Sequence, residues 1–183
     1  NHDVQRIERL ITDYSQMLKD EVALSKEKMK KINIEPIIQS VVDDYNSIYK
    51  VKKDIKINYE DDGKKEYSIN GIENRIEQMI ANLLDNSISF TEKGGKIIVN
   101  ISISSNRKIT VKIIDEGQGF KEKDTSKIFR RFYSNRPDKF GEHSGLGLNI
   151  VKNLVELHDG KILASNRPNN KGAIIEISFP SMQ

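Results

Sequence analysis

The chain has 183 residues and a net charge of +3, with 36% hydrophobic and 31% charged residues. These values predict one folded domain of ordinary size with a core, and the weak positive charge disfavours a dedicated nucleic-acid-binding protein. The chain has no cysteine and only three histidines, which excludes disulfide scaffolds, cysteine-based zinc sites and a catalytic thiol. No apolar run approaches the roughly 20 residues that cross a bilayer, so we expect a chain that is not itself embedded in a membrane.

Residues 1 to about 29 are predicted to form one helix, because no glycine or proline interrupts them. Their apolar residues recur at spacings of three and four and form a heptad-like seam: Val4, Ile7, Ile11, Tyr14 and Leu18. Such a seam packs either on the chain's own core or against another chain in a coiled coil or bundle. Its place at a chain end, before a charged stretch from Lys26 to Lys31, favours pairing with another chain.

The rest of the chain alternates helix and strand patterns. Apolar residues with helical spacing predict helices around residues 36–48, 72–84 and 146–157. Alternation of apolar and polar residues predicts strands at 55–59, 67–69, 96–104, 108–114, 161–165 and 173–179. Asp61-Asp62-Gly63 is typical of a hairpin turn between the first two strands, and the last two strands should pair as a hairpin. Adjacent strand pairs among helices indicate an α+β two-layer sandwich, with helices on one face of a mixed β-sheet.

From Asp115 to Gly147 the periodicity fades, and glycine and polar residues become frequent. An irregular stretch of this length inside a compact domain is usually a functional lid or is disordered.

The first of three segments that suggest chemistry lies inside the helix predicted at 72–84 and just beyond it. Asn82 and Asn86 are four residues apart, so their side chains project from one helix face. Amide oxygens suit Mg²⁺, which takes its other ligands from water and substrate phosphates. The alternative is a solvated polar face.

The second segment runs from Asp115 to Gly119, directly after an apolar strand. A carboxylate at a strand end can accept a hydrogen bond from an amino group, and Gly117 and Gly119 would let the backbone approach a flat ring. The spacing differs from the dinucleotide fingerprint, which needs a third glycine and opens a helix. An ordinary turn between elements is the alternative.

The third segment, Ser144-Gly145-Leu146-Gly147-Leu148, opens the last predicted helix. Glycines at a helix start leave backbone N–H groups free, and the positive end of the helix dipole attracts phosphate. No Gly-Lys-Ser/Thr follows, so this is not a Walker loop. The alternative is a glycine-rich hinge.

In this order, an amide pair, an acidic strand end and a glycine-rich helix start make up a nucleotide site. The pattern resembles the ATP-binding domain of bacterial sensor histidine kinases, within the wider group shared with gyrase, Hsp90 and MutL ATPases. Residues 82–86, 115–119 and 144–148 resemble the N, G1 and G2 boxes, and Ile128 to Tyr133 resembles the F box. The resemblance covers residues 32–180, and the leading helix is similar to the second helix of the family's dimerisation and phosphoacceptor domain.

More narrowly, the chain resembles the ChvG/ExoS type of alphaproteobacteria. This similarity lies in His2 to Ile7, in Asn135-Arg136-Pro137 and in the stretch from Phe140-Gly141 to the G2 box.

The resemblance implies a role for each matching residue. Asn86 would bind Mg²⁺ and Asn82 a phosphate or second metal contact, while Asp115 would accept the adenine amino group beside Gly117 and Gly119. A lid at about 119–144 would carry Arg131 toward phosphate and Tyr133 over the nucleotide. The triphosphate would be wrapped by Ser144, Gly145, Leu146, Gly147 and Leu148. Two departures are Ser89, where many members have lysine, and Gly172-Ala173, where many have Gly-Thr and hence a hydroxyl near adenine.

No histidine here has the family's phosphoacceptor box, so the acceptor is expected outside this chain. His2 lacks a nearby proline, His143 borders the G2 box, and His158 ends a helix, where a cation suits the dipole.

The resemblance implies domain bounds of 1–30 for the partial dimerisation domain and 31–183 for the catalytic ATP-binding domain. It implies a protein histidine kinase that uses ATP and Mg²⁺, phosphorylates a response regulator receiver domain, and forms a homodimer through the N-terminal helix. The full-length protein would lie in the bacterial inner membrane with this part cytoplasmic, and no nucleic acid would be bound. The alternatives are an ATPase of the gyrase, Hsp90 and MutL kind, which carries Glu in place of Asn82 to activate water, and a nucleotide-free interaction module.

Overall fold

The computed structural model describes residues 2–24, 27–64, 66–121, 123–131, 133, 146–168 and 171–182. The helices of the described chain are α1 (His2–Leu24), α2 (Ile34–Lys53), α3 (Glu73–Phe90), α4 (Gly147–Leu157) and the 3-10 helix η1 (Thr125–Phe129). The strands are β1 (Lys30–Asn33), β2 (Lys56–Asp61), β3 (Ser68–Gly71), β4 (Lys96–Ile103), β5 (Lys108–Asp115), β6 (Lys161–Asn166) and β7 (Ala173–Pro180).

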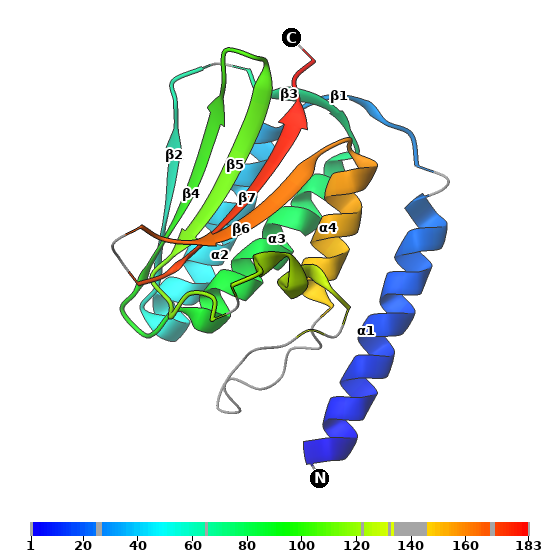
Figure 1. Ribbon diagram of the computed structural model, residues 1–183, viewed down its shortest axis with the longest axis vertical. Coiled ribbons are helices and arrows are strands. Elements are labelled where there is room, and N and C mark those ends of the chain that lie inside the picture. The colour runs from blue at the N-terminus through cyan, green and yellow to red at the C-terminus, as the bar shows by residue number, and fades with distance from the viewer. Residues whose placement is uncertain are drawn as a thin grey trace.

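Five strands form the main sheet in the order β2-β4-β5-β7-β6. The β2–β4 pair is parallel, and the other pairs are antiparallel, so the sheet is mixed. Figure 1 shows α2, α3 and α4 side by side on one face of this sheet, with α1 standing apart at the edge of the molecule. The predicted α+β two-layer sandwich, including the hairpin of the last two strands, is therefore confirmed.

The hairpin predicted at Asp61-Asp62-Gly63 is wrong. β2 pairs with β4, whereas β3 pairs with β1 in a separate two-stranded sheet. The chain does bend here, with Gly63 at φ +76°, but the bend does not join two paired strands. Asp62 instead bonds to other parts of the chain. Its carboxylate accepts a hydrogen bond from the Ile103 N–H at 2.8 Å and another from the buried Tyr67 hydroxyl.

Two further elements differ from the sequence expectation. β1 lies in a stretch whose lysines obscured any alternation, and it pairs along its length with β3. The region expected to be irregular contains η1, whose N-cap Asp124 accepts a hydrogen bond from the Ser126 N–H at 3.1 Å.

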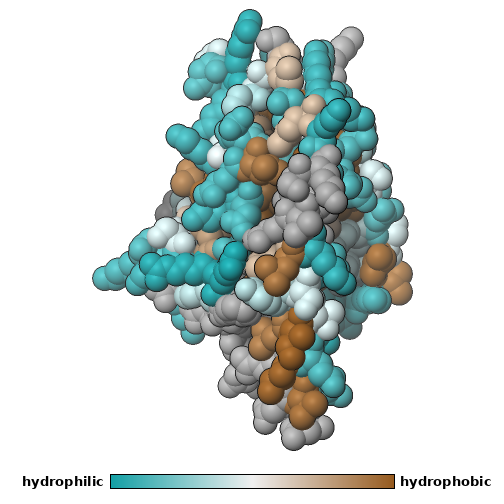
Figure 2. All heavy atoms as spheres, turned by 90° about the vertical axis from the view of Figure 1, so that its right-hand side faces the viewer, coloured by the Kyte–Doolittle hydropathy of each residue, from teal (hydrophilic) through white to brown (hydrophobic). Residues whose placement is uncertain are grey.

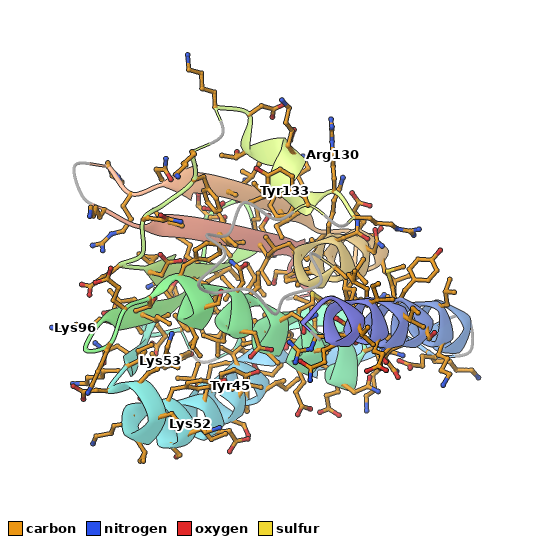
Figure 3. The ribbon with its side chains drawn as sticks, turned by 90° about the horizontal axis from the view of Figure 1, so that it is seen from below. Tyr45, Lys52, Lys53, Lys96, Arg130 and Tyr133 are labelled. Carbon is orange, nitrogen blue, oxygen red and sulfur yellow. The ribbon has the colours of Figure 1, made fainter. Side chains whose placement is uncertain are left out.

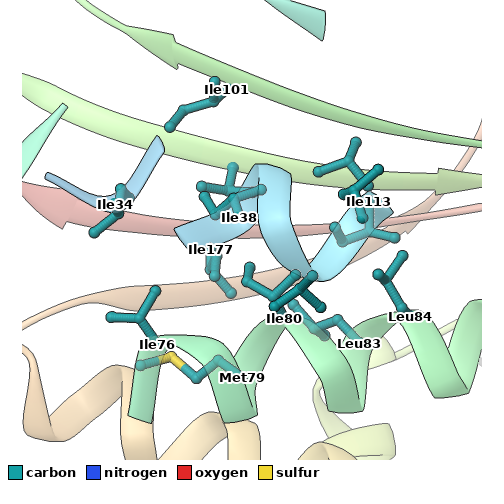
Figure 4. Packing of buried hydrophobic residues seen from close by; sticks show 14 of the residues in the cluster. Ile34, Ile38, Ile76, Met79, Ile80, Leu83, Leu84, Ile101, Ile113 and Ile177 are labelled. Carbon is teal, nitrogen blue, oxygen red and sulfur yellow. The ribbon is translucent and has the colours of Figure 1, made fainter. Parts of the chain in front are cut away.

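The core lies between the helix layer and the inner face of the sheet. Inward-facing residues alternate along β4, β5 and β7 and are nearly all fully buried, as the period-two geometry of a half-buried sheet requires. Helix α3 contributes the middle of the layer and lies between α2 and α4. Figure 4 shows this packing, in which the labelled residues are Ile34, Ile38, Ile76, Met79, Ile80, Leu83, Leu84, Ile101, Ile113 and Ile177.

Helix α1 behaves differently from the other helices, because its predicted seam is exposed. The exposed fractions are 50% for Val4, 55% for Ile7, 61% for Ile11, 37% for Tyr14 and 43% for Leu18. Figure 2, which faces this side, shows hydrophobic side chains gathered low on the molecule, where α1 begins. Met17, at 3% exposure, is the buried apolar residue of the described helix.

An ion pair holds the segment after α1 against the helix layer. The Glu27 carboxylate accepts two hydrogen bonds from the guanidinium of Arg75, at 2.7 and 3.3 Å. Arg75 lies in the first turn of α3 and also donates to Gln78 at 3.0 Å. Bidentate geometry and partial burial make this pair stronger than an ordinary surface ion pair.

Candidate functional site

Asp115 ends β5 on the inner face of the sheet, where its carboxylate is 3% exposed. Its Oδ1 accepts hydrogen bonds from the Gly117 N–H at 2.9 Å and from the Ala173 N–H at 3.1 Å. Burial raises the pKa of Asp115 above its usual value, while these N–H groups, the Ser87 hydroxyl and Arg167 act to lower it. The carboxylate is thus held in place by backbone groups from two segments of the chain.

Among the described residues, both of these hydrogen bonds go to Oδ1. The Ser87 hydroxyl also lies close enough to the carboxylate to lower its pKa. A carboxylate that backbone groups hold in a fixed orientation is suited to recognise an amino group with a charge-assisted hydrogen bond.

Three glycines bring the backbone close to Asp115. A Cβ on Gly117 would lie 2.7 Å from the Phe90 carbonyl oxygen, at the end of α3. Gly172 has φ +129°, and a Cβ there would lie 1.9 Å from the Asp115 carbonyl oxygen, which no side chain can accommodate. Gly119, at φ +77°, packs against the side chain of Asn166. The glycines therefore allow three chain segments to meet at one point.

Asn82 and Asn86 project from α3 as predicted from their spacing. Asn86 is 9% exposed and Asn82 is half-buried. The carbonyl oxygen of Asn86 accepts a hydrogen bond from the Ser89 hydroxyl at 2.6 Å, so the residue that replaces the family's lysine bonds to its own helix. The next residue, Ser87, is one of the side chains grouped around Asp115. The end of α3 therefore lies beside the segment from Asp115 to Gly119.

The end of α3 is fixed by α2. Lys53, in the last turn of α2, donates through Nζ to the carbonyl oxygens of Ile88 at 3.0 Å and Thr91 at 3.3 Å. The residue before Asn86 is also bonded to α2, because the Tyr45 hydroxyl donates to the Asp85 carboxylate at 2.9 Å. Figure 3 shows Tyr45 and Lys53 on the α2 side of the helix layer. The two Lys53 bonds go to backbone carbonyls at the helix end, where such groups lack a partner within the helix.

The start of α4 contributes Leu146, Gly147 and Leu148. Leu146 is 1% exposed, so its side chain packs inward and only its backbone can face a ligand. A Cβ on Gly147 would meet nothing within 4 Å of the described chain. Leu148 packs against the core at its edge. Ser144 and Gly145, the first half of the predicted G2 box, lie outside the described residues.

The first two residues of the predicted F box are the last two residues of η1. Ile128 and Phe129 are buried, and the Asn149 side chain of α4 donates to the Phe129 carbonyl at 3.0 Å. Arg131 is exposed and Tyr133 is half-buried. In Figure 3, Arg130 extends outward from η1 while Tyr133 lies beneath it. Half of the predicted lid, namely residue 122, Phe132 and residues 134–144, lies outside the described residues.

His158 is not the helix-end cation that its position suggested. Its ring is 3% exposed. Nδ1 lies 2.7 Å from the Leu154 carbonyl oxygen and donates to it, while Nε2 accepts from the Ile72 N–H at 3.1 Å. Burial lowers the pKa of His158, and a ring that accepts at Nε2 is neutral. The residue links the end of α4 to the start of α3. The side chain of His2 and all of His143 lie outside the described residues.

Three features of this region could not be found from sequence patterns. Ser87 has a fully buried hydroxyl that makes no hydrogen bond of ordinary geometry among the described residues, although it lies near enough to Asp115 to lower its pKa. The Ala173 N–H comes from a strand 58 residues away. Asn166 bonds to the backbone of Phe120 from a distance of 46 residues along the chain. Each depends on tertiary contact and has no local signature.

No group of three or more histidine, cysteine, aspartate or glutamate side chains that could hold a metal ion is present in the described part of the chain. No helix of that part is long and apolar enough to cross a membrane.

Comparison with known proteins shows the family to which the chain belongs. The model of histidine kinase-, DNA gyrase B- and HSP90-like ATPases matches residues 71–183. Sensor protein ChvG of Rhizobium meliloti (strain 1021) is 35% identical over 185 residues, which cover 97% of this chain and 32% of ChvG. Sensor protein KdpD of Clostridium acetobutylicum is 34% identical over 181 residues, covering 97% of this chain and 19% of KdpD. The chain thus spans about a third or less of these relatives.

Solved structures show the same fold. The catalytic domain of histidine kinase ThkA in a nucleotide-free form has a TM-score of 0.72 and 26% identity, covering 85% of this chain and 97% of that domain. Histidine kinase ThkA in complex with response regulator protein TrrA has a TM-score of 0.73 over 94% of this chain and 48% of that chain. At 24% identity the second likeness supports the fold alone.

Proposed function

The chain belongs to the family of histidine kinase-, DNA gyrase B- and HSP90-like ATPases, and we propose that it is the catalytic ATP-binding part of a two-component sensor histidine kinase. In the whole protein it would direct the γ-phosphoryl group of ATP to a histidine outside this chain, and from there to an aspartate of a response regulator receiver domain. The observation that carries the proposal is the buried Asp115 carboxylate, held at one oxygen by two backbone N–H groups and lying beside the Ser87 hydroxyl.

At the base end, Asp115 accepts the adenine amino group, and Gly117 and Gly119 line the ring. A charge-assisted bond in a buried site gives selectivity, because a base that presents a carbonyl at this position would face the carboxylate with a second acceptor. Ser87 supplies a hydroxyl at this end, where Ala173 supplies only its N–H.

At the phosphate end, Asn86 is the proposed ligand of Mg²⁺ and Asn82 the proposed contact to phosphate or a second metal position. The donor set fits this cation. Neutral amide oxygens on one helix face, without a carboxylate cluster in the described chain, suit a Mg²⁺ ion that takes its remaining ligands from water and phosphate oxygens. The bound ion would neutralise charge on the phosphoryl group.

The remaining predicted residues complete the phosphate end. Arg131 would reach phosphate and Tyr133 would cover the nucleotide from the lid of about 119–144. Ser144, Gly145, Leu146, Gly147 and Leu148 would wrap the triphosphate where α4 begins, because N–H groups of a helix start attract phosphate. The burial of Leu146 limits its contribution to the backbone.

Transfer to a histidine is favoured over hydrolysis by the chemistry of Asn82. An amide has no basic lone pair at neutral pH and cannot accept a proton from water. Phosphoryl transfer needs little beyond positioning and charge neutralisation, which the groups above supply.

We assign residues 1–30 to the end of a dimerisation domain and 31–183 to the catalytic domain. The exposed seam of α1 supports pairing with a second copy in the whole protein, because five large side chains of one helix face are left in solvent. The similarity to sensor protein ChvG supports a sensor protein, and we propose that the whole protein lies in the bacterial inner membrane with this part cytoplasmic.

The test is calorimetric titration of this chain with ATP and ADP in the presence and absence of Mg²⁺, followed by phosphotransfer. We expect nucleotide binding, no acid-labile, base-stable label on the chain itself after incubation with γ-labelled ATP, and transfer to a supplied dimerisation domain that contains the acceptor histidine. Stable labelling of any histidine of this chain would contradict the assignment of the acceptor to another part. Absence of nucleotide binding would contradict the function.

A further inference from the structure

Asn166, the last residue of β6, faces the segment that follows Asp115. Its side-chain amide makes two hydrogen bonds to one residue, accepting from the Phe120 N–H at 2.6 Å and donating to the Phe120 carbonyl at 2.9 Å. This is the bonding pattern of a strand pair, supplied by a side chain. The amide satisfies both bonds only in this orientation. If it were flipped, its NH₂ group would face the Phe120 N–H and its oxygen would face the Phe120 carbonyl.

The same residue is joined to Asp115 from its other side. The backbone of Asn166 pairs with Ala173 in the β6–β7 hairpin, and the Ala173 N–H donates to Asp115 Oδ1. Gly119 packs so closely that a Cβ there would lie 2.6 Å from the Asn166 amide oxygen. Asn166 therefore contacts the loop that leaves Asp115 and the strand that holds Asp115.

From this geometry we propose that Asn166 is a positioning residue for the nucleotide site. It fixes the backbone of Gly119 and Phe120 relative to the Asp115 carboxylate, and so sets the wall beside the base. It does not touch the nucleotide. This inference rests on the proposed ATP-binding function and assigns to an exposed residue of the last hairpin a part in it.

Side-chain chemistry makes the inference testable. Asn166→Asp keeps the shape but offers only acceptors, so it retains one bond and repels the Phe120 carbonyl. Asn166→Ala removes both bonds without adding charge. Ser165→Asp is the matched control, since it adds the same charge one residue earlier on the exposed face of β6.

Each protein is titrated with ADP and Mg²⁺, its thermal unfolding is measured without nucleotide, and hydrogen exchange is followed at the Phe120 amide. We expect both Asn166 variants to bind ADP about five- to tenfold more weakly, as loss of one or two neutral hydrogen bonds predicts. Exchange at Phe120 should rise, and the melting temperature should stay near that of Ser165→Asp.

Affinity within twofold of the wild type in both Asn166 variants would overturn the proposal, as would a loss of affinity matched by Ser165→Asp. A melting temperature that falls in proportion to affinity would also overturn it, because it would show a purely structural role. If the wild-type chain bound no ADP, the ATP-binding function would fail instead, so the two failures are distinguishable.

Discussion

The base end and the phosphate end of the site are built in different ways. At the base end, Asp115 is surrounded by groups from three separate parts of the chain, and two backbone N–H groups fix its carboxylate. At the phosphate end, Asn82 and Asn86 come from successive turns of one helix, which α2 holds at its end. The comparison teaches that the proposed base end depends on contacts between distant parts of the chain, whereas the proposed metal-binding residues lie on a single helix.

The largest effect is expected from Gly172→Ala, which disturbs the base end of the site. Gly172→Ala would place a Cβ 1.9 Å from the Asp115 carbonyl oxygen, with φ +129°. We expect a loss of roughly 3 kcal/mol in the free energy of unfolding, from overpacking and backbone strain, together with loss of nucleotide binding. Urea denaturation measures the first. The control is Gly63→Ala, which also has positive φ but meets nothing within 4 Å and should cost about 1 kcal/mol.

Asp115→Asn separates binding from stability at the same end. We expect ADP affinity to fall tenfold or more by calorimetry, because a hydrogen bond to a charged group is worth about 1.5–3 kcal/mol. The fold should not be weakened. Burial raises the folded pKa of Asp115, so its contribution to stability is present below the unfolded value and is lost as pH rises through the folded one. Asp44→Asn, on the exposed face of α2, is the control, and unchanged ADP affinity in Asp115→Asn would contradict its role.

Asn86→Ala tests the phosphate end while leaving the base end intact. The ratio of ATP affinities with and without Mg²⁺ should collapse toward one, while the affinity for adenosine is unchanged. Titrations with and without a chelator measure both quantities. Asn100→Ala, on the outer face of β4, should behave like the wild type, and an undiminished magnesium effect in Asn86→Ala would place the metal elsewhere.

Acid should weaken the contact that His158 makes between the end of α4 and the start of α3. Burial holds the pKa of His158 below its usual value, so the unfolded chain binds more protons once the pH falls below about 6.5. We expect the free energy of unfolding to drop by up to about 1.4 kcal/mol per pH unit between that value and the lower folded pKa. Denaturation of the wild type and of His158→Gln at pH 7.5 and 5.5 measures the difference, which the variant should lack. Equal pH dependence in the two proteins would contradict the neutral ring.

Sequence patterns could predict the phosphate end more fully than the base end, for a physical reason. Helical spacing alone places Asn82 and Asn86 on one face, and strand alternation alone places Asp115 at a strand end. The partners of Asp115 depend on which strands meet, and the sequence pattern wrongly paired β2 with β3. The place of Ser87 beside Asp115 was not predicted, because the helical spacing of four from Asn82 points to Asn86. The burial of His158 was not predicted, because its contacts with the start of α3 and with Phe179 leave no local pattern in the sequence.

The order of strands in the sheet has a consequence for synthesis of the chain. β7 lies between β5 and β6, both of which precede it in the sequence. While the polypeptide emerges from the ribosome, the sheet therefore stays divided, with β2, β4 and β5 able to pair and β6 left without its neighbour. The Ala173 N–H that holds Asp115 arrives with that final strand. The surroundings of Asp115 are thus incomplete until β7 has been synthesised, and a chain interrupted before β7 would carry Asp115 without the Ala173 N–H that holds its carboxylate.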